Sequence, residues 1–248
     1  MFGLTHAYIS SNVLNNIDEE VILGSIAPDL VWNDPLLKEQ ANFHKRAREF
    51  FFYVRDRFPE HLLFAKSVLL HSDMTGGVDI YSDDPKTGYA FINGKNVTDD
   101  IKILFRLENS DAIDFSHNFV EAALDILLAG DKPEFAKQFN RIGIDKQYKK
   151  YVPIIASFGN ISPIQVERAF ETLLHFYLRS DYTSISEAVQ KSLIPIAVNR
   201  FDQKSPKAVE LEKILRKTIT IIQPTYQNEI IHIIEDIKRN KQLMMLLY

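Results

Sequence analysis

The clearest candidate for chemistry in this sequence is a histidine and a glutamate four positions apart. His117 and Glu121 lie in a segment with helical apolar spacing, Asp111–Leu128. Residues four apart in a helix project from one face, with Cβ atoms about 5 to 6 Å apart, so this pair could bind one metal ion. A solvent-exposed His–Glu pair is the alternative, because such pairs are common on helices.

Three further histidines and one aspartate stand where an expected element begins or ends. His71 ends an apolar helical run and enters a glycine-rich segment, while His44 and His6 each lie in the first turn of an expected helix. Asp29 follows a helix-breaking proline, so a loop can aim its carboxylate inward. Each position also has a structural alternative: a histidine favoured by the helix dipole, a packed histidine, or an aspartate in an ordinary turn.

Composition limits the chemistry that is available. The chain has 248 residues, 46% of them hydrophobic and 25% charged, which is typical of a globular protein with a sizeable core. The absence of cysteine excludes a disulfide scaffold and a thiol nucleophile, so any metal ion must be held by His, Asp and Glu. A net charge of -4 disfavours a stable nucleic-acid complex, because no strong basic field exists to hold a phosphate backbone.

Apolar residues recur at helical spacing along most of the chain, and alternating strand-like runs are scarce. We therefore expect an all-α, multi-helix fold. Thr5 is expected to cap a first helix that runs to about Ile17, and Asp18 to open a second that stops before Pro28. Further helices are expected at Asn42–Arg57, Pro59–Ser72, Thr98–Leu107 and Asp111–Leu128, with about five more after Lys132. Four prolines stand at expected first helical positions: Pro59, Pro133, Pro163 and Pro206.

One long glycine-rich loop is expected to interrupt these helices. The segment Asp73–Lys95 contains Gly76, Gly77, Gly88 and Gly94 together with the pair Asp83-Asp84. Long loops in compact domains are usually functional or mobile. We expect residues 1–130 to form a helical core that holds the metal site, and residues 131–248 to form a helical extension packed on it, within one structural domain.

Taken in order, these residues resemble the zinc-dependent phospholipase C family, whose wider superfamily includes zinc-dependent single-strand nucleases. The resemblance covers about residues 1–128, and its residues are Thr5-His6, Gly24-Ser25-Ile26-Ala27-Pro28-Asp29, Phe43-His44, Leu70-His71-Ser72-Asp73 and Ser116-His117 through Glu121. It implies an all-helical fold with a metal cluster inside the bundle that activates water against a phosphodiester.

The resemblance also implies a set of metal ligands. These are His6, Asp29, His44, His71, His117 and Glu121, and they would hold roughly one to three zinc ions. Where the family has a further Asp and His, this chain has Thr75 and Tyr81, so Asp73 or Asp79 could supply the bridging carboxylate from the loop.

Two further roles follow for carboxylates. We assign the catalytic carboxylates to Asp29 and Asp73. Histidines that bind a metal need hydrogen-bond acceptors behind them, and the candidates are Asp114, Asp125 and Asp73.

These observations predict a metal-dependent phosphoric ester hydrolase in which a metal-bound hydroxide attacks a phosphodiester. The expected substrate is a soluble phosphoester or a phospholipid headgroup. Two alternatives stay open. One is a helical phosphohydrolase of the HD-domain kind, whose required adjacent His-Asp pair is most nearly approached here by His71-Ser72-Asp73. The other is a non-catalytic helical binding protein with a degenerate metal site.

The remaining histidines are expected to be hydrogen-bonded core residues. They lie at a helix start or within apolar helical segments, and they are His61, His175 and His232. We expect a cytoplasmic protein without a transmembrane segment, because the N-terminal sequence lacks a basic stretch followed by an apolar run and eighteen consecutive apolar residues occur nowhere.

Overall fold

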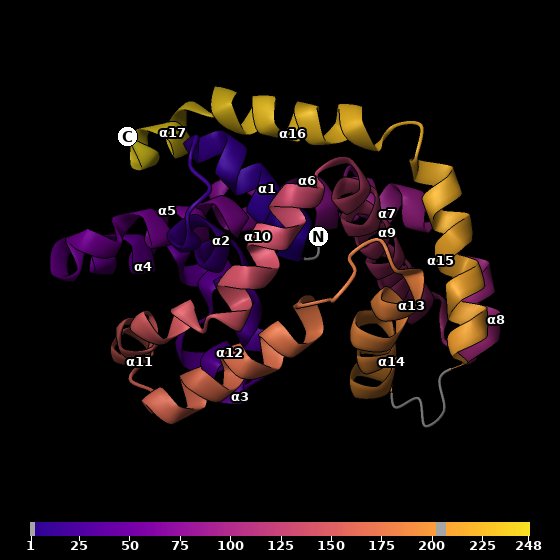
Figure 1. Ribbon diagram of the computed structural model, residues 1–248, viewed down its shortest axis with the longest axis horizontal. Helices are drawn as coiled ribbons and strands as arrows, with labels where there is room; N and C mark the ends of the chain where they lie inside the picture. The colour runs from indigo at the N-terminus through magenta and orange to yellow at the C-terminus, as the bar shows by residue number, and fades with distance from the viewer. Residues whose placement is uncertain (1–2, 202–206) are drawn as a thin grey trace. The chain divides into compact units, whose positions relative to one another are not determined.

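The computed structural model describes residues 3–201 and 207–248, and every regular element within these ranges is a helix (Figure 1). The predicted all-α fold is therefore confirmed. No helix within these ranges combines the length and the apolar character that crossing a membrane requires. The predicted helix start at Pro206 lies outside the described residues.

The described residues divide into two compact units. The first, which we call the His6 unit, contains His6–Ile80, Lys137–Leu178 and Ile233–Tyr248. The second, which we call the α9 unit, contains the described residues of Met1–Thr5, Tyr81–Ala136 and Arg179–His232. Both units take residues from both sides of position 130.

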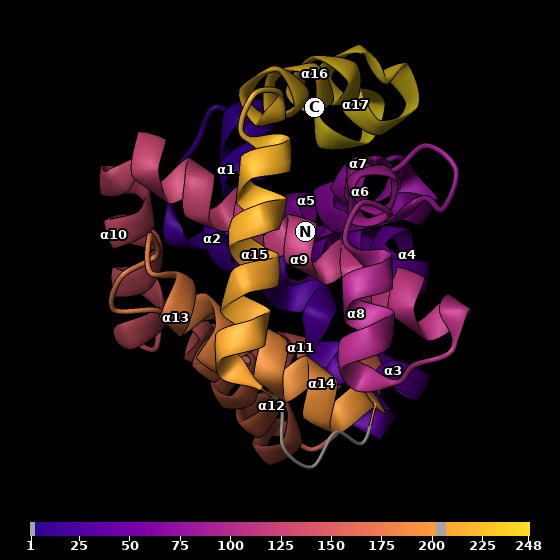
Figure 2. The ribbon, with the colours of Figure 1, turned by 90° about the vertical axis from the view of Figure 1, so that its right-hand side faces the viewer.

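In the His6 unit, helices α2 (Glu19–Ile26) and α5 (Leu62–His71) lie side by side (Figures 1 and 2). A glycine allows this close approach, since a Cβ atom at Gly24 would lie 2.4 Å from the carbonyl oxygen of Phe64. Helix α2 begins where the sequence predicted, because the Asp18 side chain accepts hydrogen bonds from the first free backbone amides of the helix. The pairing of α2 with α5 brings the ends of both helices together.

Further elements complete the His6 unit. They are η1 (Ala27–Trp32), α3 (Pro35–Gln40), α4 (Phe43–Arg57), η2 (Pro59–His61), η3 (Asp73–Thr75), η4 (Gln147–Lys150), α11 (Val152–Gly159), α12 (Pro163–Tyr177) and α17 (Lys241–Leu247). Helix α4 packs against α5 and against η1. Four helices have residues in both units: α1 (Gly3–Leu14), α6 (Val78–Asp83), α10 (Pro133–Ile144) and α16 (Tyr226–Arg239).

The α9 unit is built around one long helix, α9 (Asn109–Asp131), most of whose residues are buried. Three helices pack against it: α7 (Tyr89–Gly94), α8 (Thr98–Phe105) and α15 (Ala208–Ile222). The contact with α7 needs a glycine, because a Cβ atom at Gly94 would lie 2.8 Å from the hydroxyl oxygen of Ser116. The unit also contains α13 (Ile185–Ala188), the π-helix η5 (Val189–Leu193) and α14 (Ile194–Phe201).

The segment Asp73–Lys95 is not the single irregular loop that the sequence predicted. It contains η3 and the two short helices α6 and α7. Gly76 ends η3 with a φ of 77°, in the left-handed region that favours glycine, and Gly88 is the residue before α7. The glycines therefore separate short helices that are each too brief to show a repeated apolar spacing.

Thr5 does not cap the first helix, and this expectation is also wrong. Helix α1 runs Gly3–Leu14, so Thr5 lies within it. Its backbone amide and its hydroxyl both donate to Oδ1 of Asp125, at 2.9 and 2.6 Å. The acceptor that satisfies a first-turn amide of α1 thus comes from α9, through a contact 120 positions distant in sequence.

Candidate metal centre

Five side chains from five helical elements meet in the His6 unit, and we call them the histidine cluster. They are His6 of α1, Asp29 of η1, His44 of α4, His71 of α5 and Asp79 of α6. Two overlapping sets within the cluster have ligand atoms within 4.8 Å of one another, and His71 belongs to both sets. The cluster therefore contains donor groups close enough to hold metal ions.

Asp79 is the carboxylate around which the three imidazoles gather. Its Oδ1 lies 2.9 Å from Nε2 of His6. Its Oδ2 lies 3.0 Å from Nδ1 of His44 and 3.2 Å from Nε2 of His71. Each oxygen thus faces at least one imidazole nitrogen, so this one carboxylate contacts all three rings.

His71 is held so that one particular nitrogen faces the carboxylates. Its Nδ1 donates a hydrogen bond of 2.6 Å to the carbonyl oxygen of Ser25, which can only accept. Its Nε2 therefore faces Asp79 and also lies 3.7 Å from Oδ1 of Asp29. Metal-binding histidines usually donate a hydrogen bond from the N–H of their second ring nitrogen in this way. His71 is therefore oriented as a metal ligand would be.

The charges of the cluster are strongly coupled. Burial lowers the pKa of His71, but the negative charges of Asp79 and Asp29 outweigh burial and raise this pKa to about 9. Burial and the charge of His71 lower the pKa of His6 to about 4. Burial opposes ionisation of Asp79, yet His71 and the hydrogen bonds from the histidines hold its pKa well below the usual range. Without a metal ion, the positive charge of protonated His71 therefore offsets the negative charge of the carboxylates.

Two ring nitrogens of the cluster, other than those that face Asp79, lack a hydrogen-bond partner among the described residues. Nδ1 of His6 and Nε2 of His44 are buried, and within residues 3–201 and 207–248 they have no hydrogen-bond partner. A buried polar atom without a partner is costly, and an ion is one of the partners that can satisfy it. The donor set of imidazole nitrogens and carboxylate oxygens suits zinc.

A separate group of ligand atoms lies within the α9 unit, and we call it the Glu121 group. It consists of Asp83 at the end of α6 together with His117 and Glu121 of α9. Glu121 accepts hydrogen bonds from the hydroxyl of Ser82 at 2.9 Å and from the amide of Asn118 at 3.3 Å. Burial and the nearby charge of Asp83 raise the pKa of Glu121. These hydrogen bonds orient the carboxylate that the sequence had assigned as a ligand.

The structure places each of the six predicted metal ligands either in the histidine cluster or in the Glu121 group. His6, Asp29, His44 and His71 belong to the histidine cluster, and His117 and Glu121 belong to the Glu121 group. Asp73, which was expected to be catalytic, lies in neither set: it is exposed, and its carboxylate accepts a hydrogen bond from the backbone amide of Met74. The alternative candidate from the same segment, Asp79, is the one that lies among the histidines.

The expected acceptors behind the histidines are not found there. Asp125 binds Thr5, and Asp73 binds a backbone amide of its own turn. Asp114 has its Oδ1 3.8 Å from Nδ1 of His117, which is beyond hydrogen-bonding distance. The acceptor behind His71 is a backbone carbonyl, which no side-chain pattern reveals.

The three histidines that were left out of the site are not core residues, contrary to expectation. His61 is half-buried, and its Nδ1 lies 2.8 Å from Oε1 of Glu20. His175 and His232 are exposed. All three lie outside the histidine cluster and outside the Glu121 group.

Sequence reasoning missed two residues of the sites. Asp83 belongs to a pair of aspartates that is typical of a turn, and its neighbour Asp84 does accept the hydrogen bonds of a turn from Lys86 and Thr87. Tyr177, at the end of α12, donates its hydroxyl to Oδ2 of Asp29 at 2.5 Å. These residues are 148 positions apart, so no local pattern connects them.

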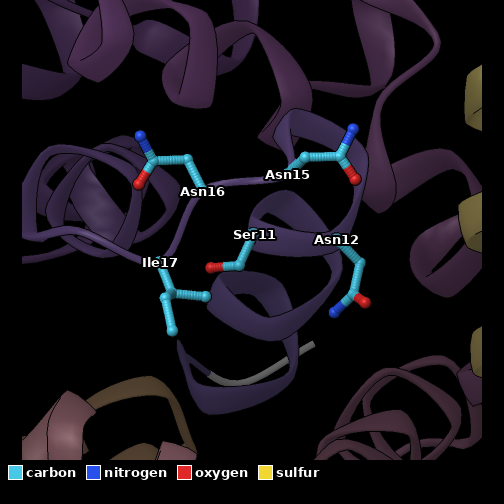
Figure 3. A pocket seen from close by; sticks show the side chains of 5 residues that line it. All are labelled: Ser11, Asn12, Asn15, Asn16 and Ile17. Carbon is cyan, nitrogen blue, oxygen red and sulfur yellow. The ribbon is translucent and has the colours of Figure 1, made fainter.

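A polar pocket lies elsewhere in the His6 unit, at the end of α1 (Figure 3). Its lining residues are Ser11, Asn12, Asn15, Asn16 and Ile17. None of these side chains is an imidazole or a carboxylate, so the pocket offers no acid, no base and no zinc site. The histidine cluster is the stronger candidate for chemistry.

No family model, curated protein or solved structure matches this chain.

Proposed function

We propose that this protein is a zinc-dependent phosphoric ester hydrolase of the phospholipase C kind, with its reaction centre at the histidine cluster. The observation that carries the proposal is the position of Asp79, whose two oxygens face the imidazole nitrogens of His6, His44 and His71 at 2.9 to 3.2 Å. Three imidazoles around one carboxylate, with a second carboxylate beside two of them, form a donor set that favours zinc over magnesium or calcium, which prefer oxygen ligands.

Zinc held by such residues would lower the pKa of bound water to about 7 and stabilise negative charge on a phosphoryl group. The protein residues have the complementary task of keeping their donor atoms fixed. Ser25 fixes the ring of His71, and the hydroxyl of Ser72 donates to the backbone carbonyl of His44 at 2.5 Å. A site fixed in this way needs little rearrangement when a substrate arrives.

Substrate would reach the cluster at His44. The side chains of His6 and His71 are each 1% exposed, whereas that of His44 is 20% exposed. Beside His44 lies Trp32, with ring centroids 5.9 Å apart, and the ammonium group of Lys38 lies 5.1 Å from the Trp32 ring. A positive charge at this edge would attract the anionic phosphate of a soluble phosphoester or of a lipid headgroup.

The test measures metal content and turnover on the same preparation. Protein purified without chelator is analysed for bound metals and assayed with bis-p-nitrophenyl phosphate. We expect bound zinc and hydrolysis, loss of both after chelation, and recovery on adding zinc. Hydrolysis that persists in the metal-free protein would contradict the proposal.

Substitutions locate the activity. His71→Gln and His44→Gln are expected to lose zinc and turnover, and the more exposed His44 provides a test should the buried His71 variant fail to fold. His61→Gln is the matched control, because His61 pairs with Glu20 in the same unit but lies outside the cluster. Full turnover in both cluster variants would place the reaction elsewhere.

One alternative keeps a specific observation in its favour. The carboxylates and imidazoles of the cluster already neutralise one another, since His71 faces both Asp79 and Asp29. A binding protein that holds metal without turnover would have the same geometry, and it would give bound zinc but no hydrolysis. The HD-type alternative has less support, because Nε2 of His71 faces Asp79 and Asp29, whereas Asp73 is exposed.

A further inference from the structure

Helix α12 ends beside the histidine cluster, and its last residue touches a candidate ligand. α12 packs against η1, the element that carries Asp29, and both lie in the His6 unit. The phenol of Tyr177 donates to Oδ2 of Asp29 at 2.5 Å. Hydrogen bonds from hydroxyl groups to carboxylates are short and strong, so this contact restricts the orientation of the carboxylate.

The two oxygens of Asp29 therefore have different surroundings. Oδ2 accepts the hydrogen bond from Tyr177. Oδ1 lies 3.7 Å from Nε2 of His44 and 3.7 Å from Nε2 of His71. The two histidine nitrogens and Oδ1 form one of the sets of ligand atoms, and Oδ2 is turned toward the phenol instead.

We infer that Tyr177 is a positioning residue that makes Asp29 a one-oxygen metal ligand and thereby favours zinc over larger ions. The inference rests on the proposed function, because it assumes a metal ion at the histidine cluster. Four-coordinate zinc takes one oxygen from a carboxylate readily, whereas larger ions with six or more ligands often take both. The phenol competes for the second oxygen and so penalises the larger ions.

The experiment compares Tyr177→Phe with wild type in metal binding. Phenylalanine keeps the ring and removes only the hydroxyl. Zinc affinity is measured by competition with a chromophoric chelator. Manganese affinity is measured from the electron paramagnetic resonance signal of the free ion. We expect zinc to bind about 10- to 100-fold more weakly, the range typical of lost hydrogen bonds to metal ligands. Manganese affinity should fall less or rise, so that the preference for zinc narrows.

Tyr53→Phe is the matched control. Tyr53 lies in the same unit and donates its hydroxyl to Ser157 at 2.7 Å, away from the cluster. This variant should retain wild-type affinities for both ions. Thermal unfolding of all three proteins in excess chelator shows whether either substitution weakens the fold itself; a merely structural role for Tyr177 would lower that stability and leave the ratio of zinc to manganese affinity unchanged.

The outcomes separate the two proposals. Zinc affinity in Tyr177→Phe equal to that of wild type, or an unchanged ratio of zinc to manganese affinity, would overturn the positioning role. Wild type that binds zinc, shows the expected loss in Tyr177→Phe and hydrolyses no phosphodiester would support the positioning role and overturn the hydrolase proposal. Wild type that binds no zinc would overturn both.

Discussion

The imidazole rings of His6 and His71 are stacked, with centroids 4.1 Å apart and planes inclined by 13°. Two buried imidazolium ions at this distance would repel each other strongly, so only one ring is positively charged at a time. That ring is His71, since it also faces Asp79 and Asp29, and the pKa of His6 falls to about 4. Protonation would therefore compete with metal binding at His71.

This competition predicts that thermal stability in chelator and zinc affinity change in opposite directions with pH. The pKa of His71 is about 9 in the folded protein against 6.5 for an unperturbed histidine. Its stabilising contribution is therefore complete below pH 6.5 and is lost as the pH rises through 9. In excess chelator, the midpoint of thermal unfolding should fall over this range, whereas zinc affinity should increase because the proton leaves. His71→Gln should remove the fall in chelator, and a flat wild-type profile would contradict the assignment.

Asp79→Asn and Asp73→Asn should differ sharply. Asp79 faces three imidazoles, so loss of its charge should weaken zinc binding at least about tenfold, as for other groups that hold or orient a metal. Asp73 is exposed, and its replacement should change stability by less than about 0.5 kcal/mol and leave zinc bound. Metal titration of both variants checks this. Equal metal loss in the two would mean that the turn at Asp73 also serves the site.

Glu121→Gln should separate metal binding from folding. Burial raises the pKa of Glu121, which means that the folded protein disfavours its ionised form and loses stability as the pH rises above the ordinary range of a glutamate. At neutral pH in excess chelator, the glutamine variant should therefore be at least as stable as wild type, while its bound metal decreases. Thermal unfolding with and without chelator tests both points. A variant less stable than wild type in chelator would give Glu121 a structural role.

The sole tryptophan of the chain should report metal binding. Trp32 lies beside His44, with ring centroids 5.9 Å apart. Cobalt, which has unpaired electrons and quenches nearby indole emission, should lower the fluorescence on binding, whereas zinc with its filled shell should not quench in this way. Zinc added first should protect the signal. Quenching with the same midpoint in His44→Gln would show that cobalt binds elsewhere.

The sequence was informative where chemistry is local. Asp18 lies directly before an apolar run and does cap α2, and the helix predicted at Asn42–Arg57 is α4. The individual metal-ligand candidates could also be found, because His44 and His71 stand at helix ends, where a side chain can enter a site from the edge of a packed element.

What the sequence left open depends on backbone turns and on distant contacts. Both Asp73 and Asp79 were candidates for the bridging role, and the choice follows from the turn at Gly76, after which α6 presents Asp79 to the histidines. Tyr177 could not be predicted, because only the packing of α12 on η1 brings it to Asp29. Residues that hydrogen-bond to a metal ligand, as Tyr177 does to Asp29, are determined by tertiary structure and not by local sequence.

The hydrogen bond from Tyr177 to Asp29 has a consequence for the order of events during synthesis. The two residues are separated by 148 positions, and a ribosome that adds about 5–20 residues per second needs about 7–30 s to make that stretch of chain. For most of this interval the growing chain contains Asp29, His44 and His71 but lacks the phenol. An ion captured by the unfinished protein would meet Asp29 with both oxygens accessible, so the inferred preference for zinc would be acquired only after the end of α12 has been made.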